Sequence, residues 1–112
     1  METKRIGFVG TRFCGTDGVS LETRKWAEVL EAEGHECFYM AGLLNTPAER
    51  SMLVPECFFE DEHVLETTKG CFGRNVRDPQ ITMKVEDIKH RLKGKVREYV
   101  DRFSLDLLIP EN

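Results

Sequence analysis

A glycine-rich stretch between an apolar run and a helical pattern constrains the fold of this chain more than any other feature. Residues 6–9 read Ile-Gly-Phe-Val, and the glycines Gly10, Gly15 and Gly18 follow before the helical pattern begins. This arrangement is typical of the first strand-to-helix turn of an open α/β sheet, where backbone N–H groups and the positive end of a helix face a ligand. We therefore expect the rest of the chain to build a sheet around this turn.

The first part of the sequence predicts a β-α-β unit. Arg5–Val9 is short and apolar without polar alternation, which suits a strand buried on both faces of a parallel sheet. A helix over residues 18–33 follows, capped by Asp17 or Ser20, and a second strand over residues 37–42 completes the unit with a right-handed crossover. The expected buried stripe of the helix is Val19, Thr23, Trp26, Ala27 and Leu30.

The middle of the chain has weaker periodicity. Leu43 to Glu56 is expected to be a loop with one helical turn near residues 47–51. We predict a short third strand over residues 54–59, at the edge of the sheet because Pro55 cannot donate a ladder hydrogen bond. An acidic start at residues 60–62 favours a short helix to residue 68, and metal binding by these carboxylates is the weaker alternative.

The last third predicts a long helix and a final strand. Apolar residues step by three or four from Thr82 to Phe103, at Val85, Ile88, Leu92, Val96, Val100 and Phe103. The outer face of this helix is rich in Lys and Arg with acidic partners, which favours a solvated face over an anion-binding patch. Leu105–Ile109 is expected to be a buried strand.

These elements predict an α/β, Rossmann-like fold with a mostly parallel sheet of about four strands in the order 3-2-1-4. Residues 1–112 form a single domain, which we expect to be incomplete, because no helix follows the last strand to cover it. We also expect a homodimer or higher oligomer, formed through this uncovered edge strand.

Composition excludes several classes of function. The chain has 112 residues and a net charge of −4, which argues against a general nucleic-acid surface. It has no apolar run long enough for a membrane span and no signal-peptide pattern, so a cytoplasmic location is expected. The four cysteines (Cys14, Cys37, Cys57 and Cys71) lack metal-ligand spacing, and we expect reduced thiols and no zinc site.

The glycine spacing narrows the chemistry of the turn. It is neither the dinucleotide fingerprint nor a Walker A loop, so no cofactor is predicted. A longer loop remains that can offer N–H donors and hydroxyls to an anionic or hydroxyl-rich ligand. The candidate substrate-binding residues are Gly10, Thr11, Arg12, Gly15, Thr16, Asp17 and Gly18. The alternative is a plain strand-to-helix turn capped by Asp17, and no catalytic or metal-binding residue is predicted.

Two segments carry a resemblance to a known family. Residues 10–23, followed by Lys25-Trp26-Ala27 and by residues 30–36, resemble the start of a retaining GT-B glycosyltransferase of the family 4 (group 1) type. Residues 107–112 resemble a later strand of that family, which ends in an Asn-bearing loop at the cleft. The stretch from Leu43 to Asp78 is similar only loosely.

The resemblance implies a two-domain enzyme in which this chain is the N-terminal, acceptor-side segment and a second domain binds the nucleotide-sugar donor. Because that second domain lies outside these 112 residues, we expect the isolated chain to be inactive. Two alternatives stay open. The first alternative is a small module that binds a nucleotide or sugar phosphate at the same turn. The second is a structural subunit that is completed by a separate polypeptide.

Overall fold

The structure is a computed structural model that describes residues 2–58, 61–71 and 79–111. Its centre is a 4-stranded sheet in the order β3-β2-β1-β4, in which every pairing is parallel. The strands are β1 (Arg5–Val9), β2 (Glu36–Ala41), β3 (Ser51–Leu53) and β4 (Leu107–Pro110). The α/β class and the strand order expected from the sequence are confirmed.

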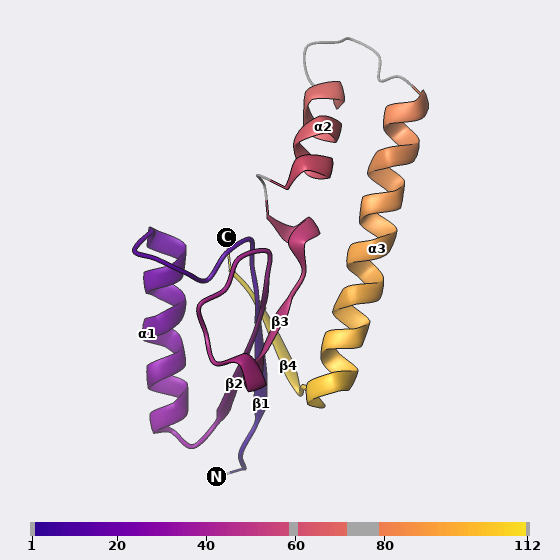
Figure 1. Ribbon diagram of the computed structural model, residues 1–112. Helices are drawn as coiled ribbons and strands as arrows, with labels where there is room; N and C mark the ends of the chain where they lie inside the picture. Colours follow the sequence, from indigo (N-terminus) through magenta and orange to yellow (C-terminus); the bar gives the residue numbers. More distant parts are fainter. Residues whose placement is uncertain (1, 59–60, 72–78, 112) are drawn as a thin grey trace.

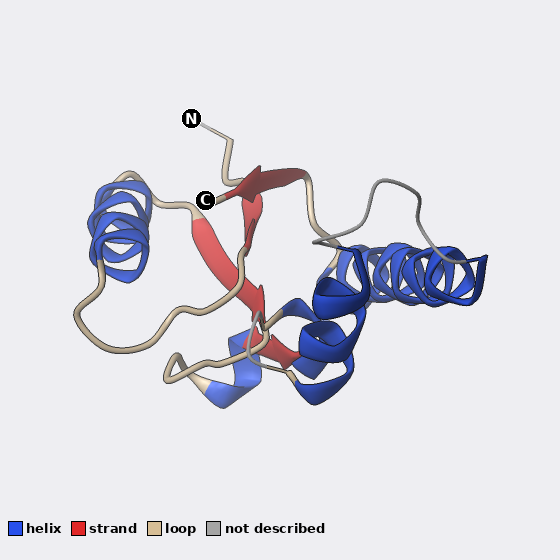
Figure 2. Cartoon of the chain, turned by 90° about the horizontal axis from the view of Figure 1, so that it is seen from above, coloured by secondary structure: helices blue, strands red, loops and turns tan. Residues whose placement is uncertain are grey.

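Helices cover both faces of this sheet. Figure 2 shows α1 (Gly18–Ala32) on one side of the strands and α3 (Pro79–Phe103) on the other. The shorter α2 (Glu62–Cys71) packs against α3. In Figure 1, α2 and the first half of α3 extend past the carboxyl ends of the strands. The edge that carries the glycine-rich turn is therefore flanked by α1 on one side and by this helical hairpin on the other.

Consecutive residues of β2 enter two separate cores, because neighbouring side chains of a strand point to opposite faces. The core under α1 consists of Phe8, Phe13, Ala27, Cys37, Tyr39 and Ala41. The core under α3 consists of Phe38, Met40, Met52, Val54, Tyr99 and Phe103. The unbroken apolar run of β2 is thus explained by burial on both faces.

The long helix predicted from Thr82 to Phe103 is confirmed, and it begins three residues earlier at Pro79. A proline is tolerated there because the first turn of a helix has no partner for its N–H groups. The buried residues of α3 are Tyr99 and Phe103. Tyr99 was not among the apolar positions of the predicted stripe.

The third strand predicted over residues 54–59 is wrong. β3 lies just before it, and Pro55–Cys57 forms a 3-10 helix in which the N–H of Cys57 donates to the carbonyl of Val54. Pro55 lacks the N–H that a strand needs and has the fixed φ that suits the first position of a helix. The edge position of the third strand is confirmed, and Phe59 lies outside the described residues.

Two smaller helices match the expected places. The turn predicted near residues 47–51 is a 3-10 helix over Ala48–Arg50. The helix predicted from residue 60 to 68 is α2, which begins at Glu62, while Glu60 lies outside the described residues.

Two predicted burials are also wrong. Trp26 is 51% exposed on α1, where its indole N–H donates to the Glu22 carboxylate, and the buried residues of this helix are Ser20, Thr23 and Ala27. The buried strand expected over residues 105–109 is β4, which begins two residues later at Leu107, and the Leu107 side chain is 51% exposed. β4 pairs with β1 alone among the described strands, so this strand lies at the rim of the sheet.

Candidate functional site

The glycine-rich loop of residues 10–17 leaves β1 at its carboxyl end and first runs beside residues 42–45. The N–H of Phe13 donates to the carbonyl of Leu43 at 2.9 Å, and the N–H of Asn45 donates to the carbonyl of Phe13 at 3.2 Å. These bonds continue the parallel pairing of β1 and β2 beyond the sheet. The second half of the loop then turns back into α1.

Ser20 holds this turn in place from inside the first turn of α1. Its hydroxyl donates to the Asp17 carboxylate at 2.7 Å and accepts from the N–H of Cys14 at 3.0 Å. The Asp17 carboxylate also accepts the Ser20 N–H at 3.1 Å, so Asp17, and not Ser20, is the N-cap of the two predicted candidates. These hydrogen bonds from Ser20 lower the pKa of the Asp17 carboxyl, and the positive charge of Arg12 acts in the same direction.

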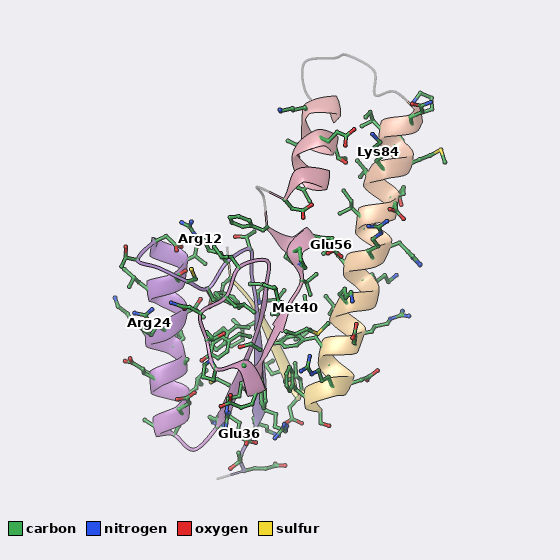
Figure 3. All side chains as sticks on the ribbon, in the orientation of Figure 1. Arg12, Arg24, Glu36, Met40, Glu56 and Lys84 are labelled. Carbon is green, nitrogen blue, oxygen red and sulfur yellow. The ribbon has the colours of Figure 1, made fainter. Side chains whose placement is uncertain are left out.

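The two charged side chains among the predicted site residues bind each other. The Nε of Arg12 lies 3.1 Å from a carboxylate oxygen of Asp17. This ion pair spans the loop, so both side chains stabilise its shape. Figure 3 places Arg12 at the end of α1 beside the loop and Arg24 farther along the same helix.

The other predicted site residues are glycines and threonines of the loop and of the first position of α1. Gly10 donates its N–H to the carbonyl of Met40 at 3.0 Å and lies against the ring of Phe13. Thr11, Thr16 and Gly18 are exposed. Gly15 is also exposed and has φ +83°, a conformation that glycine adopts without the strain a Cβ would add.

The described part of this loop has backbone N–H groups that are free to donate hydrogen bonds to a ligand. Within residues 2–58, 61–71 and 79–111, the N–H groups of Gly15, Thr16, Gly18 and Val19 have no hydrogen-bond acceptor. They lie at the start of α1, where the helix dipole is positive. The loop can therefore bind the oxygen atoms of an anion through its backbone.

A pair of carboxyl groups lies close to this loop and was missed in the sequence. Glu111 follows β4 and donates its N–H to the carbonyl of Val9 at 2.8 Å, which places it at the same carboxyl edge. Burial raises the pKa of Glu111, and the negative charge of Glu22 on α1 adds to this effect. Carboxylates here can accept hydrogen bonds from ligand hydroxyls. Position directly after a strand was the only signal in the sequence.

A pocket of about 250 Å³ lies beside the loop, between α1 and residues 45–47. Its walls are formed by Phe13, Ser20, Thr23, Arg24, Tyr39, Asn45, Thr46 and Pro47. None of these residues was in the predicted site, because they come from the loop after β1, from α1, from β2 and from the loop after β2, which only the fold brings together. Burial raises the pKa of Tyr39 to about 12, so its hydroxyl stays protonated and able to donate.

The thiols contribute no site that the described residues reveal. Cys14, Cys37 and Cys57 are free, and burial raises the pKa of Cys37 and of Cys57 to about 11. Within the parts of the chain that the structure describes, no group of His, Cys, Asp and Glu could hold a metal ion. The described helices include none that is both long enough and apolar enough to cross a membrane.

No protein-family model, curated protein or solved structure matches this chain.

Proposed function

We propose that this chain is the acceptor-side segment of a retaining GT-B glycosyltransferase of the family 4 type, with the glycine-rich loop as one wall of its cleft. The single observation that carries the proposal is that the N–H groups of Gly15, Thr16, Gly18 and Val19 have no acceptor among the described residues. These groups lie at the carboxyl edge of a parallel sheet, which is where open α/β folds bind ligands.

The groups around this edge suit a ligand that carries both phosphate and hydroxyl groups. Backbone N–H donors and the positive end of α1 favour phosphate oxygens. The carboxyl groups of Glu22 and Glu111 can accept hydrogen bonds from the hydroxyl groups of a ligand. A nucleotide-sugar or a phosphorylated sugar has both kinds of group, whereas a purely apolar ligand has neither.

Transfer of the sugar also requires groups on the side of the cleft opposite the glycine-rich loop. A departing nucleoside diphosphate develops negative charge, which cations or N–H donors must stabilise from the opposite side of the cleft. The described loop supplies donors from one side, and its arginine, Arg12, is paired with Asp17. A second Rossmann-like domain would supply the other side, so the chain alone is expected to bind weakly and to transfer nothing.

Residue-resolved NMR titration tests the proposal. UDP-glucose and GDP-mannose are added separately to the ¹⁵N-labelled chain, with glucose as the uncharged control. We expect saturable shifts at the amides of residues 15–19, with a Kd on the order of 1 mM, and no sugar transfer. Shifts elsewhere only, no shifts, or transfer of sugar by the pure chain would contradict the proposal.

We also propose that the chain associates through β4 into a homodimer or higher oligomer. β4 is the outer strand of the described sheet on its side, and Leu107 is 51% exposed. An open edge strand presents unpaired N–H and C=O groups that favour pairing with another strand. Sedimentation at tens of micromolar should show a dimer or larger species, and a clean monomer would overturn this proposal.

A further inference from the structure

The pocket between α1 and residues 45–47 has the composition of a ligand site in its own right. Two aromatic residues, Phe13 and Tyr39, contribute to its wall, with ring centroids 6.1 Å apart in an edge-to-face arrangement. Polar side chains from two other segments, Arg24 on α1 and Asn45 and Thr46 in the loop after β2, also line it. An apolar wall with a few convergent polar groups is typical of small-molecule pockets.

Several of these polar groups lack partners. Among the residues that the structure describes, Arg24 forms no ion pair and the side chain of Asn45 forms no hydrogen bond. Thr46 is satisfied differently, since its hydroxyl bonds that of Ser51 at 2.6 Å. The described part of the pocket thus offers the Arg24 guanidinium and the Asn45 amide to a ligand.

Thr23 supplies a third and independent observation. It is 2% exposed, and its Oγ1 is a buried oxygen with no hydrogen-bond partner in the described structure. A buried hydroxyl without a partner is unfavourable by about 1–3 kcal/mol. Because Thr23 lines the pocket, rotation about χ1 between the two positions that threonine adopts in helices can turn the hydroxyl toward a ligand.

We propose that this pocket binds a monosaccharide-sized polyol that carries one anionic group, with Arg24 binding the anion, Asn45 and Thr23 the hydroxyls, and Phe13 and Tyr39 the apolar face of the ring. Among the described residues, the pocket is lined by Phe13 of the glycine-rich loop but not by Gly15, Thr16, Gly18 or Val19. This proposal therefore stands whether or not the chain belongs to a glycosyltransferase.

The test is a titration of the ¹⁵N-labelled chain with glucose 6-phosphate, glucuronate and glucose. We expect both anions to shift the amides of Thr23, Asn45 and Thr46, with glucose binding about tenfold more weakly because it cannot pair with Arg24. Shifts confined to residues 15–19 would assign the anion to the loop and overturn the proposal. Absence of shifts at concentrations on the order of 10 mM would overturn it as well.

Three variants make the assignment specific. Thr23→Val keeps the shape of the side chain and should weaken binding of all three probes about 2- to 10-fold. Arg24→Gln should weaken the two anions and leave glucose unchanged, whereas Lys25→Gln, which removes a neighbouring exposed charge outside the pocket, should change none. Equal effects of Arg24→Gln and Lys25→Gln would contradict the site. Arg24 is exposed, so its variant decides the question even if Thr23→Val fails to fold.

Discussion

The hydroxyl of Tyr99 donates a hydrogen bond to the carbonyl oxygen of Phe8 at 3.0 Å, across 91 residues of sequence. Both residues are fully buried. Tyr99 lies near the end of α3, and Phe8 lies in the strand that leads into the glycine-rich loop. This bond therefore ties the helix on one face of the sheet to the strand that positions the candidate site.

Replacing Tyr99 by Phe should lower the free energy of unfolding by about 1 kcal/mol, because the carbonyl of Phe8 loses a buried donor. Urea denaturation measures this loss. Tyr39→Phe is the matched control, since the Tyr39 hydroxyl has no hydrogen bond within the described residues. Equal losses in the two variants would show that the bond to Phe8 contributes nothing specific.

Ser20→Ala should be more destabilising than Thr16→Ala, which truncates an exposed side chain of the loop that Ser20 holds in place. The buried Ser20 hydroxyl bonds both the Asp17 carboxylate and the Cys14 N–H, and its removal should lower the free energy of unfolding by about 1–3 kcal/mol. Thr16→Ala, at an exposed position, is the control and should change it by less than about 0.5 kcal/mol. Similar values for both variants would contradict the role of Ser20 in holding the loop.

The Asp17 cap predicts a dependence of stability on pH. The pKa of the Asp17 carboxyl is lowered in the folded chain from the ordinary value of 3.8. The folded structure therefore stabilises the ionised carboxylate relative to the protonated acid. This contribution is fully present above pH 3.8 and is lost as pH falls through the lowered folded pKa. In Asp17→Asn, a cap that does not titrate, this part of the acid destabilisation should disappear. Identical pH profiles of wild type and variant would refute the prediction.

Gly94→Ala should raise the free energy of unfolding by about 0.5–1 kcal/mol. Gly94 lies inside α3, it is exposed, and a Cβ built there meets no atom within 4 Å. Alanine therefore gains helix propensity without a clash. Thermal and urea unfolding measure the gain, with the exposed Lys93→Ala as the control for helix-surface changes. A loss of stability in Gly94→Ala would mean that this position of α3 needs its glycine.

Local patterns in the sequence were sufficient for the order of the sheet. The apolar runs of β1 and β2 reflect burial on both faces of the sheet. The cap at Asp17 and the apolar period of α3 are local patterns in the sequence. The position of the third strand does not follow from the sequence, because the three residues of β3 are too few to show a periodic pattern. Pro55 is compatible both with an edge strand and with the start of a 3-10 helix, and it begins a 3-10 helix. Helical spacing predicts that Trp26 is buried, but its side chain is 51% exposed, because it lies on a side of α1 that the sheet does not cover.

The candidate site was predictable only where it is local. The loop of residues 10–18 follows from glycine placement, and its cap from Asp17. The pairing of Arg12 with Asp17 depends on the path of the loop, which composition does not determine. Glu111 and the pocket around Thr23 and Asn45 depend on segments brought together by parallel pairing, so no spacing rule indicates them.

Titration of two glycine variants with UDP-glucose tests the central claim most directly. Gly15 has φ +83° and Gly34 has φ +95°, and a Cβ at either position meets no atom within 4 Å. Alanine therefore introduces the same backbone strain at both, in the loop for Gly15→Ala and at the far end of α1 for Gly34→Ala. We predict that UDP-glucose shifts the amides of residues 15–19 in wild type and in Gly34→Ala, and that Gly15→Ala weakens this binding strongly. Unchanged binding in Gly15→Ala, or equal weakening in both variants, would contradict the assignment of the glycine-rich loop as the ligand-binding wall.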